Sequence, residues 1–90
     1  MNSGNDIASV ESKVTKVICS QLDIPHGTDI LRMDVKKDLG ANKEDMVAII
    51  MLLERLFDLR LLDDRLNHLS NVGDIAQLIH REISSELIKP

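Results

Sequence analysis

Apolar and polar residues follow the period of an α-helix in three stretches of the chain. In the first, between Val10 and Leu22, lysine, threonine and serine residues separate apolar positions that fall on one helical face. Ser9 stands just before this face and is expected to cap the helix by accepting from a free backbone N–H. Pro25 and Gly27 follow it and are expected to end the helix. The apolar face consists of Val10, Val14, Val17, Ile18 and Leu22.

The second stretch, from about Lys43 to Asp58, predicts another helix. Asn42 is a favourable N-cap, and Asp45 places a negative charge near the positive end of the helix dipole. With residues placed at helical intervals, one face is apolar and is expected to enter the core. This face consists of Met46, Ile49, Ile50, Leu53, Leu56 and Phe57.

The opposite face of this second helix mixes charged and apolar side chains. It consists of Glu44, Val47, Ala48, Met51, Glu54, Arg55 and Asp58. A purely solvated face carries fewer apolar residues than this. Two interpretations stay open: either the helix is deeply buried from Met46 to Leu53, or its outward face binds a partner.

The remaining segments predict a short helix, a last helix and a long first loop. Asp63 to His68 is expected to form about two helical turns, and Ser70-Asn71 is expected to cap a helix from Val72 to about Ser85. Between Pro25 and Gly40 the pattern is irregular, and the scattered apolar residues of this loop are expected to contact the core. The core face of the last helix consists of Val72, Ile75, Ala76, Leu78, Ile79 and Ile83.

Three longer helices, one short helix and a long first loop predict an all-α four-helix bundle. A chain of 90 residues has room for one domain with one core. We expect a flexible N-terminus over residues 1–8, the helical domain over residues 9–85 and a C-terminal tail over residues 86–90.

Composition and charge narrow the class of partner. Hydrophobic residues make up 43% of the chain and charged residues 29%, which is typical of a globular protein. The formal net charge of -4 disfavours DNA and anionic membranes, and the single aromatic residue, Phe57, leaves no stacking platform for single-stranded nucleic acid. The longest apolar run, Met46 to Leu53, is far shorter than the roughly 20 residues of a membrane span. We therefore expect a protein partner, with no nucleic acid and no membrane insertion.

Candidate catalytic and metal-binding groups are scarce. His26, His68 and His80 share no metal-ligand spacing, and no Gly-rich phosphate loop or nucleophile elbow is present in the sequence. The single cysteine, Cys19, is expected to be half-buried and indicates a reducing, cytoplasmic compartment, with a reactive thiol as the alternative. The sequence therefore predicts neither an enzyme nor a metal or cofactor site.

The order of these elements and one motif resemble the acyl carrier protein family over about Val10 to His80. The signature of that family reads roughly Asp-Leu-Gly-Ala-Asp-Ser-Leu-Asp at the start of its second helix. Further on, Leu53-Glu54, Phe57-Asp58 and Asp63-Asp64 also follow the family's pattern. The resemblance implies a four-helix carrier fold from fatty-acid or polyketide-type biosynthesis. The segment that corresponds to the signature agrees at five of its eight positions and reads Asp38-Leu39-Gly40-Ala41-Asn42-Lys43-Glu44-Asp45.

The resemblance breaks at the residue on which carrier function depends. In the family, the serine of the signature receives phosphopantetheine, whose thiol carries acyl groups as thioesters. The corresponding residue here is Lys43, whose ammonium group cannot form that phosphodiester, and its neighbours Asn42 and Glu44 differ from the signature as well. The hydroxyls of Thr28 and Ser70 lie in other segments and are not expected to replace the serine. We therefore expect no phosphopantetheine at Lys43, which is interpreted either as a solvated lysine at a helix end or as a salt-bridge partner of another protein.

In the family, the second helix is also an acidic surface that docks on enzymes. Most of this acidity is absent here, so the resemblance implies a different partner, bound partly by apolar contact. Leu66, Ile75 and Leu78 stand where some members have small or polar residues, which implies a filled core with less room for an acyl chain. The candidate partner surface consists of Lys43, Glu44, Val47, Ala48, Met51, Glu54 and Arg55.

These features lead to one hypothesis and two alternatives. The first is a degenerate carrier fold kept as a non-catalytic interaction or accessory module, with biosynthetic enzymes or a larger assembly as its partners and a weak homodimer as a further state. The second is a carrier that holds acyl or lipid cargo by another route, for example non-covalently between its helices. The third is a helical regulator that shares the bundle by chance, and the nearly gapless match argues against it.

Overall fold

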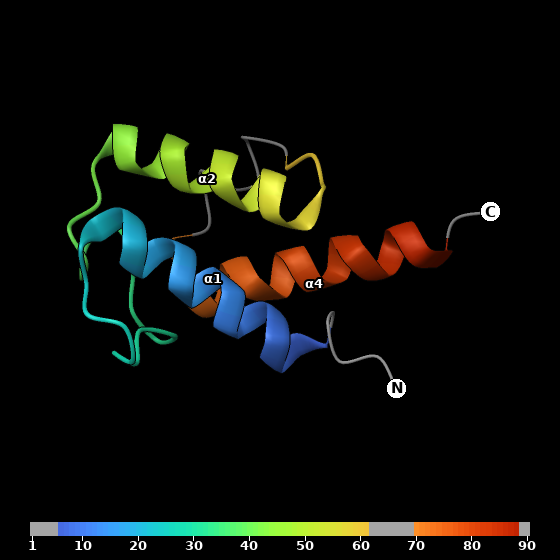
Figure 1. The fold of residues 1–90 in the computed structure, drawn as a ribbon, viewed down its shortest axis with the longest axis horizontal. Helices are drawn as coiled ribbons and strands as arrows, with labels where there is room; N and C mark the ends of the chain where they lie inside the picture. Colours follow the sequence, from blue (N-terminus) through green and yellow to red (C-terminus); the bar gives the residue numbers. More distant parts are fainter. Residues whose placement is uncertain (1–5, 62–69, 89–90) are drawn as a thin grey trace.

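The computed structural model of the chain describes residues 6–61 and 70–88. Within these ranges the fold is all-α and contains three helices: α1, Ile7–Leu22; α2, Lys43–Phe57; and α4, Val72–Ile88 (Figure 1). Helix α1 packs against both α2 and α4. The short helix predicted for Asp63 to His68 lies outside the described residues. The prediction of a helical bundle is therefore confirmed for its three longer helices.

Helix α1 begins earlier than its apolar pattern predicts. Its N-cap is Asp6, whose carboxylate accepts the backbone N–H of Ser9 at 2.8 Å. The prediction of Ser9 as the cap was therefore wrong, because the carboxylate three residues before it caps an additional turn that starts at Ile7. At the other end, Asp23 adopts a left-handed conformation with φ 57° and donates its N–H to the carbonyl of Cys19.

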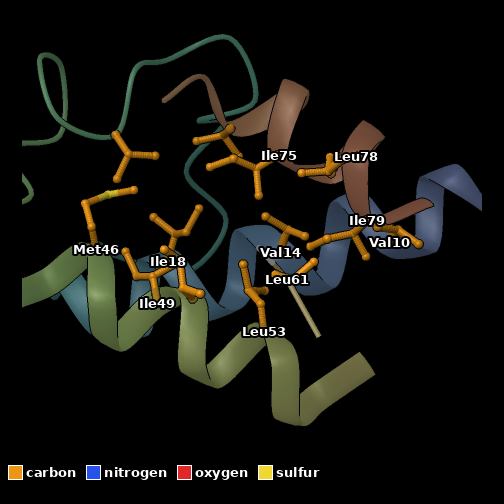
Figure 2. Close-up of a cluster of buried hydrophobic side chains, with 14 of the residues drawn as sticks. Val10, Val14, Ile18, Met46, Ile49, Leu53, Leu61, Ile75, Leu78 and Ile79 are labelled. Carbon is orange, nitrogen blue, oxygen red and sulfur yellow. The ribbon is translucent and has the colours of Figure 1, made fainter. Parts of the chain in front are cut away.

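The core lies among the three helices, and each contributes one apolar face to it. Figure 2 shows Val10, Val14 and Ile18 of α1 pointing toward side chains of α2 and α4. All six residues predicted for the last helix are buried. From α2, the buried residues are Met46, Ile49, Ile50 and Leu53, and from α4 they are Val72, Ile75, Ala76, Leu78, Ile79 and Ile83.

One residue at the end of α2 departs from the predicted core face. Leu56 keeps 49% of its surface exposed, so its assignment to the core was wrong. It lies at the edge of the apolar face, in the last turn of the helix. Phe57, by contrast, is half-buried and packs against the core as predicted. The ammonium group of Lys13 in α1 lies 5.9 Å from the centre of its ring, within cation–π range.

The long first loop is part of the folded core. Ile30 and Val35 are fully buried, which confirms that apolar residues of this loop contact the core. Backbone hydrogen bonds join the loop to the start of α4: the N–H of Val72 donates to the carbonyl of Met33 at 3.0 Å, and the N–H of Gly73 donates to that of Leu31 at 2.9 Å. These contacts hold in place the loop that leads into α2.

The two residues predicted to cap α4, Ser70 and Asn71, have different roles. Asn71 accepts the N–H of Asp74 at 3.2 Å and caps the helix as predicted. Ser70 instead donates its hydroxyl to the carboxylate of Asp34 in the loop, at 2.5 Å. Ser70 therefore connects the loop to the start of α4, and of these two residues only Asn71 caps the helix.

Cys19 is more deeply placed than its half-buried prediction. Only 1% of its surface is exposed, and burial raises the pKa of its thiol. A thiol of this kind holds its proton at neutral pH and is a weak nucleophile. The alternative of a reactive thiol at Cys19 therefore receives no support.

The described residues contain neither a membrane-spanning helix nor a cluster of metal ligands. None of the helices in residues 6–61 and 70–88 is both long and apolar enough to cross a bilayer. Across those residues, no three histidine, cysteine, aspartate or glutamate side chains gather in a way that would hold a metal ion.

Candidate functional site

The site is built on a turn that precedes α2. Asp34 accepts the backbone N–H groups of Lys36 and Lys37 through one carboxylate oxygen, at 2.9 and 2.8 Å. Its other carboxylate oxygen accepts the hydroxyl of Ser70. These bonds lower the pKa of Asp34, the Ser70 hydroxyl most and the Lys37 N–H next. The carboxylate of Asp34 thereby fixes the turn to the start of α4.

The three residues Asp38, Leu39 and Gly40 complete the turn, each in a different way. Asp38 accepts the backbone N–H of Asp34 at 2.8 Å, which closes the turn on itself. Leu39 is half-buried and packs against the core. Gly40 has φ 76°, a left-handed conformation that glycine adopts without steric cost. This part of the motif therefore has a structural role that does not depend on any bound group.

Helix α2 then begins with a capping box. The side chain of Asn42 accepts the N–H of Asp45 at 2.7 Å, and the carboxylate of Asp45 accepts the N–H of Asn42 at 3.1 Å. Two backbone groups that lack helical partners are satisfied in this way. The prediction of Asn42 as the N-cap is confirmed, and Asp45 contributes a hydrogen bond as well as its charge.

Lys43 is the first residue of α2, and its side chain is exposed. Its neighbours in the sequence, Asn42 and Glu44, are exposed too. The described hydroxyls of Thr28 and Ser70 are both engaged in other segments, the first with the carbonyl of Pro25 at 2.7 Å and the second with Asp34. Asn42, Lys43 and Glu44 are therefore all on the surface, at a helix N-terminus.

The outward face of α2 is apolar at its middle and accessible. Val47 is 53% exposed and Met51 58%, while Ala48 is half-buried. Leu52 and Leu56 add further exposed apolar surface on the same helix. Of the two interpretations of the stretch from Met46 to Leu53, burial on all sides is excluded, and an accessible apolar face remains.

Glu54 has a structural contact in addition to its place in the candidate surface. Its side chain is half-buried, and its carboxylate accepts the backbone N–H of Leu61 at 2.9 Å. Its carbonyl accepts the N–H groups of Asp58 and Leu59. Glu54 therefore holds the chain that leaves α2. Glu44 lies in the first turn of the helix, and its side chain is exposed.

A groove runs along one flank of α2. Two lysines, Lys36 from the loop and Lys43 from the helix, line it together with Asn42 and Glu54. Its apolar lining consists of Ala41, Met46, Val47, Ile50, Met51 and Leu61. The groove therefore combines apolar side chains with two cations.

The predicted surface residues divide between this groove and a second, shallower hollow. Lys43 and Val47 line the groove, whereas Ala48 and Arg55 line the hollow, and Met51 and Glu54 line both. Glu44 lines neither. The structure therefore brings the predicted residues onto one helix, on two adjoining surfaces.

Sequence reasoning missed the parts played by Asp34 and Lys36. The signal for Asp34 is the spacing Asp-Val-Lys-Lys-Asp, in which an aspartate side chain accepts N–H groups two and three residues later. The place of Lys36 in the groove has no such signal, because it depends on how the turn lies against α2.

Comparisons with known proteins extend the resemblance beyond the signature. No family model matches the chain. The chain is 33% identical over 73 residues to an acyl carrier protein of Phytoplasma mali, a match that covers 81% of this chain and 87% of that protein. It is 25% identical over 80 residues to an acyl carrier protein of Amoebophilus asiaticus, covering 89% of this chain and 100% of that protein. Both matches cover most of this chain and most of the matched protein.

Proposed function

Because the chain belongs to the acyl carrier protein family, we propose that it is a member without a phosphopantetheine arm, acting as a non-catalytic interaction module. The family consists of carriers, so the chain is not an enzyme. The observation that carries the proposal is Lys43 at the position that corresponds to the attachment serine. An ε-ammonium group offers no oxygen for the phosphodiester that joins the arm to its carrier.

The distribution of retained and changed residues supports the proposal. The retained Asp38, Leu39 and Gly40 build the turn, whereas the changed Asn42, Lys43 and Glu44 are exposed. Loss of carrier chemistry removes selection on the exposed positions only, because the turn is still needed for the fold. The accessible apolar middle of α2 then serves contact with proteins, among them enzymes or assemblies of fatty-acid or related biosynthesis.

The proposal is tested by the intact mass of the protein after incubation with coenzyme A and a broad-specificity phosphopantetheinyl transferase. The expected result is an unmodified wild type. Lys43→Ser, and a variant that also carries Asn42→Asp and Glu44→Leu, restore the signature in two steps and should gain the arm if the surrounding surface still fits the transferase. Lys43→Ala is the matched control that should stay unmodified. A wild type that gains the mass of the arm overturns the proposal.

A second candidate function is a carrier that holds acyl or lipid cargo without a covalent arm. The groove along α2 favours it, because its apolar lining suits an alkyl chain while Lys36 and Lys43 suit a carboxylate. Titration of the ¹⁵N-labelled protein with octanoate distinguishes the two functions. Shifts of the amide signals of Ile50 and Leu61 that weaken in Lys36→Gln/Lys43→Gln would favour the carrier, and unchanged signals would exclude this cargo.

A further inference from the structure

Four side chains of α2 lie on the side of the helix that faces away from the core. They are spaced four, three and four residues apart, so that they fall within about 60° of the helix circumference. Figure 2 shows Met46, Ile49 and Leu53 of the same helix pointing into the core. By helical spacing, these three residues lie on the opposite side of the helix from the four. We call the four residues the outward stripe, and they are Glu44, Ala48, Met51 and Arg55.

The outward stripe has an acid at one end, an apolar middle and a base at the other end. Glu44 and Arg55 are both exposed, and they lie equally far from the midpoint of the stripe. Ala48 and Met51 also lie equally far from that midpoint. In a two-fold-symmetric pair of antiparallel helices, residues at equal distances from the midpoint face each other. Glu44 of one copy would then face Arg55 of the other, and Ala48 would face Met51.

We propose that the outward stripe binds the outward stripe of a second copy of the chain, in an antiparallel, two-fold-symmetric dimer. The inference rests on the proposed function, since it names the partner of the accessible face of α2. The charge balance of the stripe selects this partner. A strongly basic protein would gain from Glu44 but be repelled by Arg55, whereas a second copy satisfies both charges at once.

The shape of the surface supports the same arrangement. A shallow hollow lies over the small side chain of Ala48, lined also by Leu52 and Arg55 and by Gln21 of α1. In the dimer, Met51 of the second copy enters this hollow, and its unbranched side chain adapts to an irregular gap. Val47 and Leu52, both exposed, flank the stripe. In the dimer they would bury further apolar surface away from water.

The size of the interface predicts a weak dimer. One face of a helix with 15 residues is a small contact surface, below the total of about 1,200 Å² at which stable interfaces begin. The dimer is therefore expected to dissociate at micromolar concentrations and to form as the protein is concentrated.

The test is sedimentation equilibrium of the wild type and of charge-reversed variants, from about 10 µM to about 1 mM. The wild type is expected to approach twice the monomer mass at the upper end of this range. Glu44→Arg and Arg55→Glu should each raise the dissociation constant about tenfold, because each replaces two symmetric attractions by two repulsions. Circular dichroism checks that both variants keep their helices, as expected for exposed positions.

Mixing the two variants gives the decisive result. Each is repelled by its own copies, but Glu44→Arg and Arg55→Glu complement each other, so the mixture should associate more tightly than either variant alone. The double variant Glu44→Arg/Arg55→Glu should restore the homodimer. Within one chain these residues lie about 16 Å apart along the helix, so this rescue reports contact between copies. A mixture that associates no better than its components overturns the proposal.

One substitution in the middle of the stripe and one outside it form a matched pair. Met51→Glu should abolish the dimer, whereas Leu56→Glu places the same charge on an exposed apolar residue outside the stripe and should leave it intact. Equal effects of the two substitutions would contradict the proposed geometry.

The dimer and the proposed function can fail independently. A wild type that is monomeric up to about 1 mM overturns the dimer but leaves the proposed function in place. A dimer that accepts phosphopantetheine overturns only the proposed function.

Discussion

Asp34 shows how much of the candidate site depends on one carboxylate. Its side chain accepts the hydroxyl of Ser70 and the N–H groups of Lys37 and Lys36, while its carbonyl accepts the N–H groups of Asp38 and Leu39. The first three bonds favour the ionised form and lower the pKa of the side chain. The turn ahead of α2 is therefore coupled to the protonation of this residue.

A pH-dependent contribution to stability follows from Asp34. Its pKa is lower in the folded than in the unfolded chain, so the unfolded chain takes up the proton first as the pH falls, and protonation favours unfolding. The contribution is complete above the ordinary aspartate pKa of about 4 and is lost as the pH falls through the lower, folded-state value. Urea denaturation of the wild type and Asp34→Asn should give a gap in unfolding free energy that is largest at neutral pH and narrows below about pH 4. A gap that stays constant down to acid pH would contradict this account.

At the same scale, the family signature separates into two sets of residues. Asp38, Leu39 and Gly40 have contacts or a backbone conformation that the turn requires. Lys43 and Glu44 have exposed side chains whose identity the fold does not determine. A protein that loses its arm can therefore change the second set while it keeps the first.

At the scale of the element, α2 depends on its first turn. The reciprocal bonds of Asn42 and Asp45 satisfy two backbone N–H groups that would otherwise lack partners. The signature of the family has an aspartate in place of Asn42, and both residues are strong N-caps. The change at this position is therefore expected to alter charge without altering the helix.

Two substitutions test this expectation. Asn42→Ala should lower the unfolding free energy by about 1 kcal/mol, because one half of the capping box is lost. Asn42→Asp should leave it within about 0.5 kcal/mol of the wild type. Thermal unfolding followed by circular dichroism measures both. If the aspartate destabilised as much as the alanine, the capping function assigned to this side chain would be incorrect.

Helical periodicity is a reliable guide to the faces of α2 except at its edge. Met46, Ile49 and Leu53 are in the core as the period predicts, whereas Leu56 is half-exposed in the last turn. Periodicity assigns a direction around the helix axis, but burial also requires a neighbour at that height along the axis. Leu56 stands at the edge of the apolar face and stays half-exposed, whereas Phe57, at the next position, packs against the core.

At the scale of the whole molecule, the loop between α1 and α2 completes the core. Ile30 and Val35 are as fully buried as Val14 and Ile49 of the helices. Backbone bonds from Val72 and Gly73 fix the same loop to α4. The position of Lys43 is consequently determined by contacts with both other helices.

Truncation of a buried side chain in this loop should therefore lower the unfolding free energy as much as truncation of a buried side chain in a helix. Ile30→Ala is expected to lower the unfolding free energy by about 3 kcal/mol, because it leaves a cavity in a packed core. Arg32→Ala, at an exposed position in the same loop, should change it by less than about 0.5 kcal/mol. Chemical denaturation measures both values. Equal effects of the two substitutions would show that the loop is not part of the core.

The sequence by itself determined the helical class, most of the core faces of the helices, the N-cap Asn42 and the lysine at position 43. These are local properties, since helical period, capping and side-chain chemistry are set by residues a few positions apart. Only the tertiary structure decided that Ser70 donates a hydrogen bond to Asp34 of the loop and that Leu56 stays half-exposed. It also decided that Lys36 and Lys43 line the same groove. It also decided that the apolar middle of α2 faces outward, because burial depends on which elements cover a face, and residues far apart in the chain supply that cover.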